Sequence, residues 1–302
     1  MNGFIITLIW PFVIPKGTLR IECVGVLRRI KWGFSMQMID IGDAELATWR
    51  EGKGDPVFLI SGLGGRAAFW SELITGLAPH FDVISHDHRG TGASTKSKID
   101  YSISQMADDV MKLMGALNIP KAALVGHSTG GAIAQHLALN HAERITKIVL
   151  SATWAGPNLY FKTLFELRSQ ILRDAGPEAY MIDGILRAHP HDTVSNTPAL
   201  LAATNEERLA AFPGEEIEQS RIRAVLAHDL RAQVPNIALP SFVICAEDDQ
   251  ITPVGFSHEL IDLIPNVQST LLPRGGHFMP RVEPDAYNAA VLSFLTNTQS
   301  EM

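Results

Sequence analysis

Short apolar runs alternate with longer amphipathic stretches along most of the chain from residue 37. The short runs are rich in aliphatic residues and end at turns that contain glycine or proline, which is typical of strands. In the longer stretches, apolar residues recur three or four positions apart, as on one face of a helix. We therefore predict strands at 38–41, 45–50, 56–61, 81–85, 122–125, 145–150, 241–245 and 269–272, and helices at 69–77, 102–117, 130–139, 256–263 and 285–295.

The order of these elements predicts an α/β fold. Strands that alternate with helices form βαβ units, which build a mainly parallel central sheet flanked by helices. Residues 155–236 interrupt the alternation, because they have helical periodicity and no convincing strand. We expect residues 36–154 and 237–302 to form one core, and residues 155–236 to form a helical lid over the carboxyl edge of its sheet.

The first 35 residues do not fit this pattern. Residues 4–14 are apolar apart from Thr7 and Pro11, but a membrane-spanning helix needs about 20 such residues. Basic residues follow this run instead of preceding it, so a signal peptide is not indicated. Met36 lies just before the first predicted strand, and Met38 lies at its start. We expect residues 1–35 to be an extension outside the core, with a weak membrane-surface anchor as the alternative.

Composition narrows the functional classes. The chain has 302 residues, of which 46% are hydrophobic and 19% charged, as expected for a soluble globular protein. The formal net charge of -7 provides no basic face for a nucleic acid and no attraction to an anionic membrane. The two cysteines, Cys23 and Cys245, form no disulfide framework, so a reducing cytoplasm is the simplest compartment.

The sharpest local motif is Gly-His-Ser-Thr-Gly at residues 126–130, between a predicted strand and a predicted helix. This spacing matches the nucleophile elbow, G-x-S-x-G. A serine in such a tight turn needs small neighbours because backbone segments crowd there. The alternative is a glycine-rich helix start without chemistry. The context favours Ser128 as a nucleophile.

A serine hydroxyl needs a base to remove its proton, and in this type of fold the acid and then the histidine follow the serine along the chain. His277 is the best candidate, because it follows Gly275 and Gly276 in a loop after a strand. Other histidines are more simply packed or solvated in helices (His136, His141 and His258). His189 and His191 are expected to be exposed on the lid, with contact to the substrate as the alternative.

The loop after strand 241–245 contains three acids that could orient His277. We prefer Asp249, with Asp248 second and Glu247 third. A carboxylate at this point would hold the imidazole in the tautomer that accepts the serine proton. For the oxyanion hole we predict the amides of Thr129 and Leu63, with Gly64 as the alternative to Leu63.

Together these motifs resemble the α/β-hydrolase superfamily over about residues 38–295. The matching segments are 61–65, 87–92, 126–130 and 275–277, with Asp249 and Pro253. Within the superfamily the chain is most similar to small catabolic hydrolases: aminoacrylate hydrolases, 3-oxoadipate enol-lactonases and N-formylmaleamate deformylases. Segments 100–103 and 105–107 are similar to the aminoacrylate group in particular, as are Cys245 and Ala246 with Asp248 and Asp249. Ser61 stands where relatives usually have histidine, and the full elbow motif is absent from some aminoacrylate-type sequences.

The resemblance implies the α/β-hydrolase fold with a helical lid, and it assigns a structural turn to residues 87–92. At the start of that turn, His86 and His88 could instead suggest a metal site. Only one residue separates them and no cluster of further ligands accompanies them, so they make a poor ligand set. Five lid arginines could pair with a substrate carboxylate, although a solvated helix face is the simpler expectation for most of them: Arg168, Arg173, Arg187, Arg221 and Arg223.

We expect a serine hydrolase that needs no metal, nucleotide or flavin and cleaves an ester, lactone or amide-type bond of a small catabolic metabolite. Its partners would be a small-molecule substrate and water, with self-association left open. A cofactor-free haloperoxidase or a carbon–carbon bond hydrolase would use the same triad. A ligand-binding protein that has lost turnover is the alternative from another class.

Overall fold

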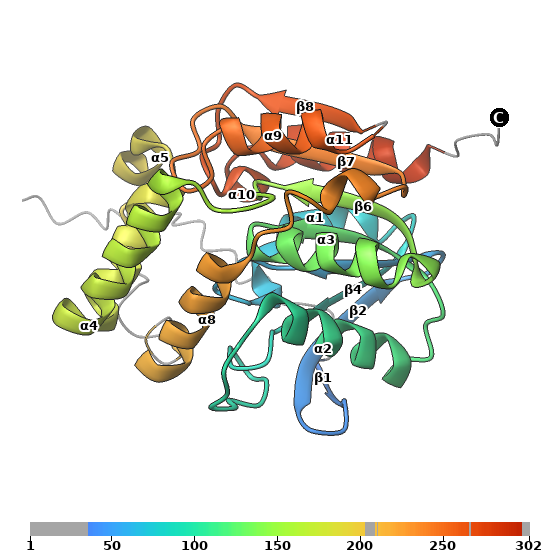
Figure 1. Cartoon of the computed structure of the whole chain (residues 1–302), viewed down its shortest axis with the longest axis horizontal. Helices are drawn as coiled ribbons and strands as arrows, with labels where there is room; N and C mark the ends of the chain where they lie inside the picture. Colours follow the sequence, from blue (N-terminus) through green and yellow to red (C-terminus); the bar gives the residue numbers. More distant parts are fainter. Residues whose placement is uncertain (1–35, 203–208, 210, 266, 298–302) are drawn as a thin grey trace, which may run out of the picture. The chain divides into compact units, whose positions relative to one another are not determined.

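The computed structural model describes residues 36–202, 209, 211–265 and 267–297. The predicted extension, residues 1–35, lies outside these described residues. An eight-stranded sheet forms the centre, in the order β1-β2-β4-β3-β5-β6-β7-β8 (Figure 1). Its strands are β1 (Gln37–Asp40), β2 (Glu45–Gly52), β3 (Pro56–Ile60), β4 (Asp82–His86), β5 (Ala122–His127), β6 (Ile145–Ser151), β7 (Ser241–Ala246) and β8 (Gln268–Leu272).

The sheet is parallel from β4 through β8, while β1 and β2 join it antiparallel. Every residue of β5 and β7 is buried, and both strands read as continuous apolar runs with few polar interruptions. This pattern is typical of parallel strands covered on both faces. The predicted mainly parallel α/β sheet is confirmed, and each predicted strand is present with small shifts at its ends.

Helices pack against both faces of the sheet (Figure 1). One layer contains α2 (Ile103–Ala116), α3 (Thr129–Asn140) and α9 (Gly255–Leu263), and the other contains α1 (Ser71–Leu77), α10 (Met279–Val282) and α11 (Pro284–Thr296). Ser102 caps α2 by accepting a hydrogen bond from the Gln105 amide at 3.0 Å. The pattern of the sequence did not predict α10, because one helical turn is too short to show periodicity.

A helical insertion follows β6 and precedes β7. It contains α4 (Leu159–Ala188), α5 (His191–Asn196), α6 (Ala199–Ala202), α8 (Glu215–Ala227) and the 3₁₀ helix η3 (Val234–Asn236). Gly176 (φ 83°) and Pro177 kink α4. Helix α4 packs against α8. Figure 1 shows α4, α5 and α8 gathered beyond one end of the sheet. Among the described residues, no helix combines the length and apolar character needed to cross a membrane.

Candidate active site

Ser128 lies at the sharp turn between β5 and α3, and its backbone has φ 54° and ψ -117°. This conformation is rare for a residue with a Cβ and stores strain of about 1–3 kcal/mol. Two hydrogen bonds to the Ser128 backbone hold the turn: its amide donates to the Ser151 carbonyl at 2.8 Å, and its carbonyl accepts from the Thr153 hydroxyl at 2.8 Å. This turn places Ser128 at the carboxyl edge of the sheet, directly after the last residue of β5.

The two glycines of the elbow are required by close backbone contacts. A Cβ added at Gly126 would lie 2.2 Å from the Gly130 carbonyl oxygen, and one added at Gly130 would lie 1.9 Å from the Ile60 carbonyl oxygen. Both approaches are far inside van der Waals contact. The crowding expected from the motif is therefore present in the fold.

His277 lies in the loop after β8 and is hydrogen-bonded to Asp249, with 2.8 Å between its Nδ1 and Asp249 Oδ2. Both residues are buried. Asp249 also accepts from the amides of Ile251 (2.7 Å) and Thr252 (3.0 Å), and from the Thr252 hydroxyl (2.8 Å). Because an ionised carboxylate is acceptor-only, this set of donors suits a charged Asp249. The bond leaves Nε2 of His277 as the nitrogen available to a second partner.

The other two acids of this loop occupy different positions. Asp248 accepts from the amides of Gly275 (3.3 Å) and Gly276 (2.8 Å), so it holds the turn that carries His277. Both glycines have positive φ, at 131° and 61°. Glu247 is exposed. Of the three acids, Asp249 contacts the imidazole and Asp248 supports its loop.

The glycine-rich loop after β3 runs beside the elbow. A Cβ added at Gly62 would lie 3.2 Å from Ser128 Cβ, so the two backbones are in close contact. The Gly65 amide donates to the Gly62 carbonyl at 2.9 Å, which closes a tight turn around Leu63 and Gly64. Both predicted loop donors, Leu63 and Gly64, line the same cavity as Ser128. Thr129, the other predicted donor, is the first residue of α3.

Ser128, His277 and the glycine-rich loop line one cavity of about 570 Å³. The inserted helices contribute to the lining of this cavity through α4 and α8. Most other lining side chains are apolar or aromatic, including Phe69, Phe165, Met181, Ile185, Phe212 and Phe278. A cavity of this size and character is typical of a small-molecule site.

His127, which lies directly before the nucleophile candidate, was not among the predicted site residues. Its ring stacks on Phe69 with 4.7 Å between centroids and lies 4.8 Å from the His277 ring. Burial, with the neighbouring His277, holds the pKa of His127 well below its usual value. His127 therefore packs as a neutral ring behind His277. The only sequence signal was its place inside the elbow motif.

One lid expectation was wrong. His189, expected at the surface, is buried, with its Nδ1 3.0 Å from the Ile185 carbonyl oxygen and its ring against Phe278. A solvated face was expected for most of the five lid arginines: Arg173 and Arg223 are exposed, Arg187 is half-buried, and Arg168 and Arg221 are buried. The reason is that α4 and α8 pack on each other and on the core, so part of each polar helix face is covered.

Arg221 on α8 binds the loops beneath the cavity. Its Nη2 donates to the Leu63 carbonyl at 2.8 Å and lies 3.2 Å from His88 Nδ1, and its Nη1 donates to the Arg89 carbonyl at 3.1 Å. A guanidinium only donates, so Nδ1 of His88 is an acceptor and its ring is neutral. Burial and the nearby Arg221 charge lower the pKa of His88 accordingly. Arg221 thus connects the inserted helices to the loop that holds Leu63.

We expect Arg221→Met to lower the free energy of unfolding by about 3–5 kcal/mol, because it removes the donor for the Leu63 and Arg89 carbonyls and for His88 Nδ1 and takes a buried charge away from Glu218. Urea denaturation followed by circular dichroism measures the change. Arg223→Met on the same helix is the matched control, since Arg223 is exposed, and should change stability by less than about 0.5 kcal/mol. Equal losses in the two variants would contradict the anchoring role of Arg221.

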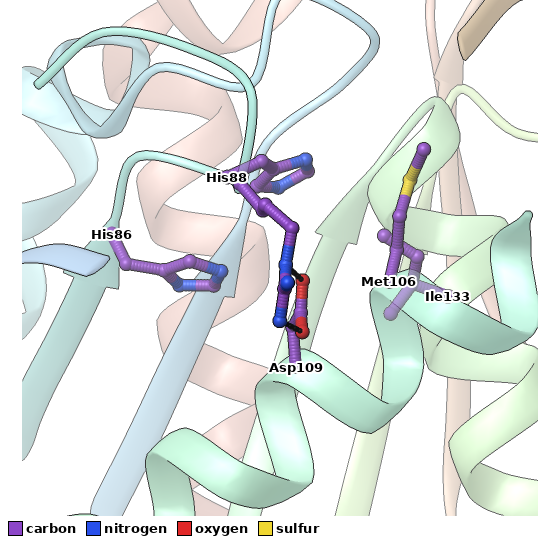
Figure 2. A pocket seen from close by; sticks show the side chains of 6 residues that line it. His86, His88, Met106, Asp109 and Ile133 are labelled. Carbon is purple, nitrogen blue, oxygen red and sulfur yellow. Dashed lines mark hydrogen bonds and ion pairs between the residues drawn. The ribbon is translucent and has the colours of Figure 1, made fainter. Parts of the chain in front are cut away.

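The 87–92 turn lies close to a second, very small cavity (Figure 2). His86 and His88 stack there with 5.3 Å between ring centroids, and Arg89 forms a fork with Asp109 at 2.9 and 2.7 Å. Asp87 accepts from the amides of Ala67 and Ala93, each at 2.9 Å, which holds the turn together. Two guanidinium groups beside these imidazoles disfavour a cation, and the described part of the chain has no cluster of three or more metal-ligating side chains.

Comparison with known proteins places the chain in a family. Residues 55–284 match the model of the alpha/beta hydrolase fold. The chain is 36% identical over 240 residues to "Putative carbamate hydrolase RutD" of Caulobacter vibrioides, covering 79% of this chain and 89% of that protein. A protein of the same name from Serratia proteamaculans is 34% identical over 243 residues, covering 80% of this chain and 91% of that protein.

A solved structure of a hydrolase is similar to this chain as well. The enol-lactonase from Burkholderia xenovorans LB400 superposes with a TM-score of 0.80 at 28% identity, covering 86% of this chain and all of that one. The resemblance to small catabolic hydrolases is thus confirmed at the level of family and fold. With its mainly parallel sheet, its strained serine turn and these relatives, this chain belongs to the alpha/beta hydrolase fold family.

Proposed function

We propose that this chain is a serine hydrolase that cleaves an ester, lactone or amide-type bond of a small catabolic metabolite through an acyl-enzyme on Ser128. His277 acts as general base and acid, and Asp249 orients it. The observation that carries the proposal is that Ser128 and His277, from distant parts of the sequence, line one cavity while His277 is bonded to a buried carboxylate. The names of the relatives, a carbamate hydrolase and an enol-lactonase, support hydrolytic chemistry at a carbonyl.

Acylation begins when Nε2 of His277 accepts the proton of the Ser128 hydroxyl. The Ser128 oxygen forms a bond to the substrate carbonyl carbon, and the carbonyl electron pair moves onto oxygen. When the carbonyl re-forms, the bond to the leaving group breaks and His277 gives its proton to that group. Asp249 stabilises the imidazolium between these two transfers through the 2.8 Å bond to Nδ1.

Deacylation follows the same steps, with water in place of the Ser128 hydroxyl as the nucleophile. His277 accepts a proton from water, the resulting oxygen attacks the acyl carbon, and the proton returns to Ser128 as the acid product leaves. Each transfer uses only side chains and amides of this chain together with water.

The oxyanion is stabilised by two backbone amides, those of Thr129 and Leu63. Thr129 begins α3, where the first amides of a helix lack intrahelical acceptors and the helix dipole favours negative charge. Leu63 lies in the tight turn that Arg221 holds through the Leu63 carbonyl. Each such donor is worth about 2.7–4 kcal/mol in the transition state.

The inserted helices act as the lid of this site. In this proposal residues 36–154 and 237–302 supply the catalytic core and residues 155–236 cover it. The arrangement is supported by the contributions of α4 and α8 to the cavity wall. Exclusion of water by such a cover strengthens the electrostatic interactions inside.

Covalent labelling with a fluorophosphonate tests the proposal. The wild-type protein should lose activity as one adduct forms, and peptide mass spectrometry should place that adduct on Ser128. Ser128→Ala should not react, whereas Ser241→Ala, which removes a buried hydroxyl at the start of β7, should react like wild type. A protein that only binds ligands would remain unlabelled, and this result would refute the hydrolase assignment.

A further inference from the structure

We propose that Arg221 is a positioning residue for catalysis, because it links the inserted helix α8 to the oxyanion hole and makes the reaction at Ser128 depend on how that helix is docked. The inference rests on the proposed function and specifies how its transition state is stabilised. It starts from the direction of the Arg221 contacts. The side chain is fully buried on α8, yet every hydrogen bond of its guanidinium within the described part of the chain reaches a loop of the core.

The Leu63 carbonyl depends on Arg221 for its hydrogen bond. Arg221 Nη2 donates to it at 2.8 Å, and no other donor to this oxygen is found among the described residues. The end of the loop, by contrast, is held by the core itself. The Gly65 carbonyl accepts from the His88 amide at 2.8 Å and from the Thr91 hydroxyl at 2.9 Å. Arg221 therefore fixes a peptide group that the core leaves without a donor.

The turn that contains this peptide could adopt a second conformation. Turns of type I and type II differ mainly in the direction of their central peptide group, here the one between Leu63 and Gly64, and type II needs positive φ at the third residue. Gly64 has no positive φ, so the turn is not of type II. A glycine adopts positive φ at little cost, and a Cβ added to Gly64 would meet nothing within 4 Å. The bond from Arg221 is thus what opposes rotation of the central peptide.

Rotation of this peptide would reverse the electrostatics of the oxyanion hole. Arg221, toward which the Leu63 carbonyl points, does not belong to the cavity lining. After rotation, the carbonyl oxygen would turn toward the cavity, where its partial negative charge would oppose the developing oxyanion, and the Gly64 amide would turn away. Groups aimed at the oxyanion are usually the largest electrostatic contribution to such a reaction. Arg221 therefore acts on the transition state through the loop, without contacting the substrate.

Helix α8 connects this bond to the part of the cavity that the inserted helices form. Glu218, one turn before Arg221 on α8, lines the cavity and accepts from the hydroxyl of Tyr180 on α4 at 2.7 Å. A substrate that packs against α4 and α8 therefore stabilises the docked position of α8, in which Arg221 reaches the Leu63 carbonyl. Binding of the substrate and stabilisation of the oxyanion are coupled by this arrangement.

Two matched ketones test this role. The carbonyl carbon of trifluoromethyl hexyl ketone forms a bond to the Ser128 oxygen, the hydroxyl proton moves to His277, and the carbonyl electron pair becomes an oxyanion. Methyl hexyl ketone binds without reacting. Arg221→Met should lower kcat for p-nitrophenyl octanoate by about 10- to 100-fold with little change in KM, and should raise the Ki of the trifluoromethyl ketone by a similar factor. The Ki of methyl hexyl ketone should change by less than about twofold.

The Ki values separate this role from a merely structural one. Unfolding of part of the protein lowers the concentration of active sites, which fluorophosphonate labelling counts, but it changes neither KM nor Ki. A purely structural Arg221 would therefore leave both Ki values of Arg221→Met equal to those of wild type, and this result would overturn the proposal.

Ser220→Ala is the matched control. Ser220 is the buried neighbour of Arg221 on α8 and also binds the core, since its hydroxyl accepts from the Tyr101 amide at 2.9 Å and donates to the Ile99 carbonyl at 3.0 Å. It has no bond to the Leu63 loop, so the variant should keep the wild-type kcat and both Ki values. An equal rise in the trifluoromethyl ketone Ki in the two variants would refute a specific role of Arg221.

If Arg221→Met yields no folded protein, Arg221→Lys decides. Its ammonium keeps the charge but not the planar fork that reaches several acceptors at once, so the Ki of the trifluoromethyl ketone should rise by about tenfold. A wild-type Ki in Arg221→Lys would then overturn the proposal. Failure of the wild-type protein to bind the trifluoromethyl ketone and to form a fluorophosphonate adduct would instead count against the proposed function.

Discussion

Ser128→Ala is expected to lower kcat by about 10⁴- to 10⁶-fold, which corresponds to about 5–8 kcal/mol of lost transition-state stabilisation. The physical reason is that no other hydroxyl takes the position of Ser128 at the strained elbow, so the acyl-enzyme cannot form. The remaining activity would come from the oxyanion donors and from binding. Steady-state hydrolysis of a p-nitrophenyl ester measures the effect.

The fold of this variant should be intact, because the bonds that hold the turn involve the Ser128 backbone and not its hydroxyl. Circular dichroism and thermal unfolding should therefore match wild type closely. Ser241→Ala is the matched control and should retain wild-type kcat. Activity of Ser128→Ala within tenfold of wild type would contradict the assignment of the nucleophile.

Asp249→Asn should lower kcat by about 10⁴-fold. The amide occupies the same volume, but its NH₂ group can donate to Nδ1 of His277 and so favour the tautomer that places the proton on Nε2. That tautomer cannot accept the Ser128 proton, and the positive charge on the imidazolium loses its counter-charge. The measurement is the pH profile of kcat/KM for wild type and variant.

Asp248→Asn is the control for this substitution, since the neighbouring carboxylate contacts the backbone of the His277 loop and not its ring. The amide oxygen of asparagine can still accept from Gly276, so kcat should fall by less than about tenfold. Similar losses in the two variants would show that the loop as a whole, and not the Asp249–His277 bond, limits activity.

The fold and the location of the site could be predicted from local patterns. Parallel strands covered on both faces are continuous apolar runs, and β5 and β7 stand out in the sequence for that reason. The elbow could be identified because its requirements are local: Gly126 and Gly130 are needed by backbone contacts within and beside one turn. His277 could be identified for a similar reason, because two glycines with positive φ directly precede it.

Burial of the lid arginines could not be predicted in this way. Arg168 and Arg221 lie on helices with charged neighbours, and nothing in the local pattern separates them from the exposed Arg173 and Arg223. Their burial depends on which faces of α4 and α8 meet each other and the loops after β3 and β4, which is a property of tertiary packing. The predicted exposure of His189 was wrong for the same reason.

The most direct test of the account is to trap the covalent intermediate. Wild-type protein is mixed with p-nitrophenyl acetate, quenched in acid during the initial burst, and digested for peptide mass spectrometry. We expect an acetyl group on the Ser128 hydroxyl, absent from Ser128→Ala and unchanged in amount in Ser241→Ala. Turnover of the ester with no acyl group on Ser128, or with the group on another residue, would contradict it.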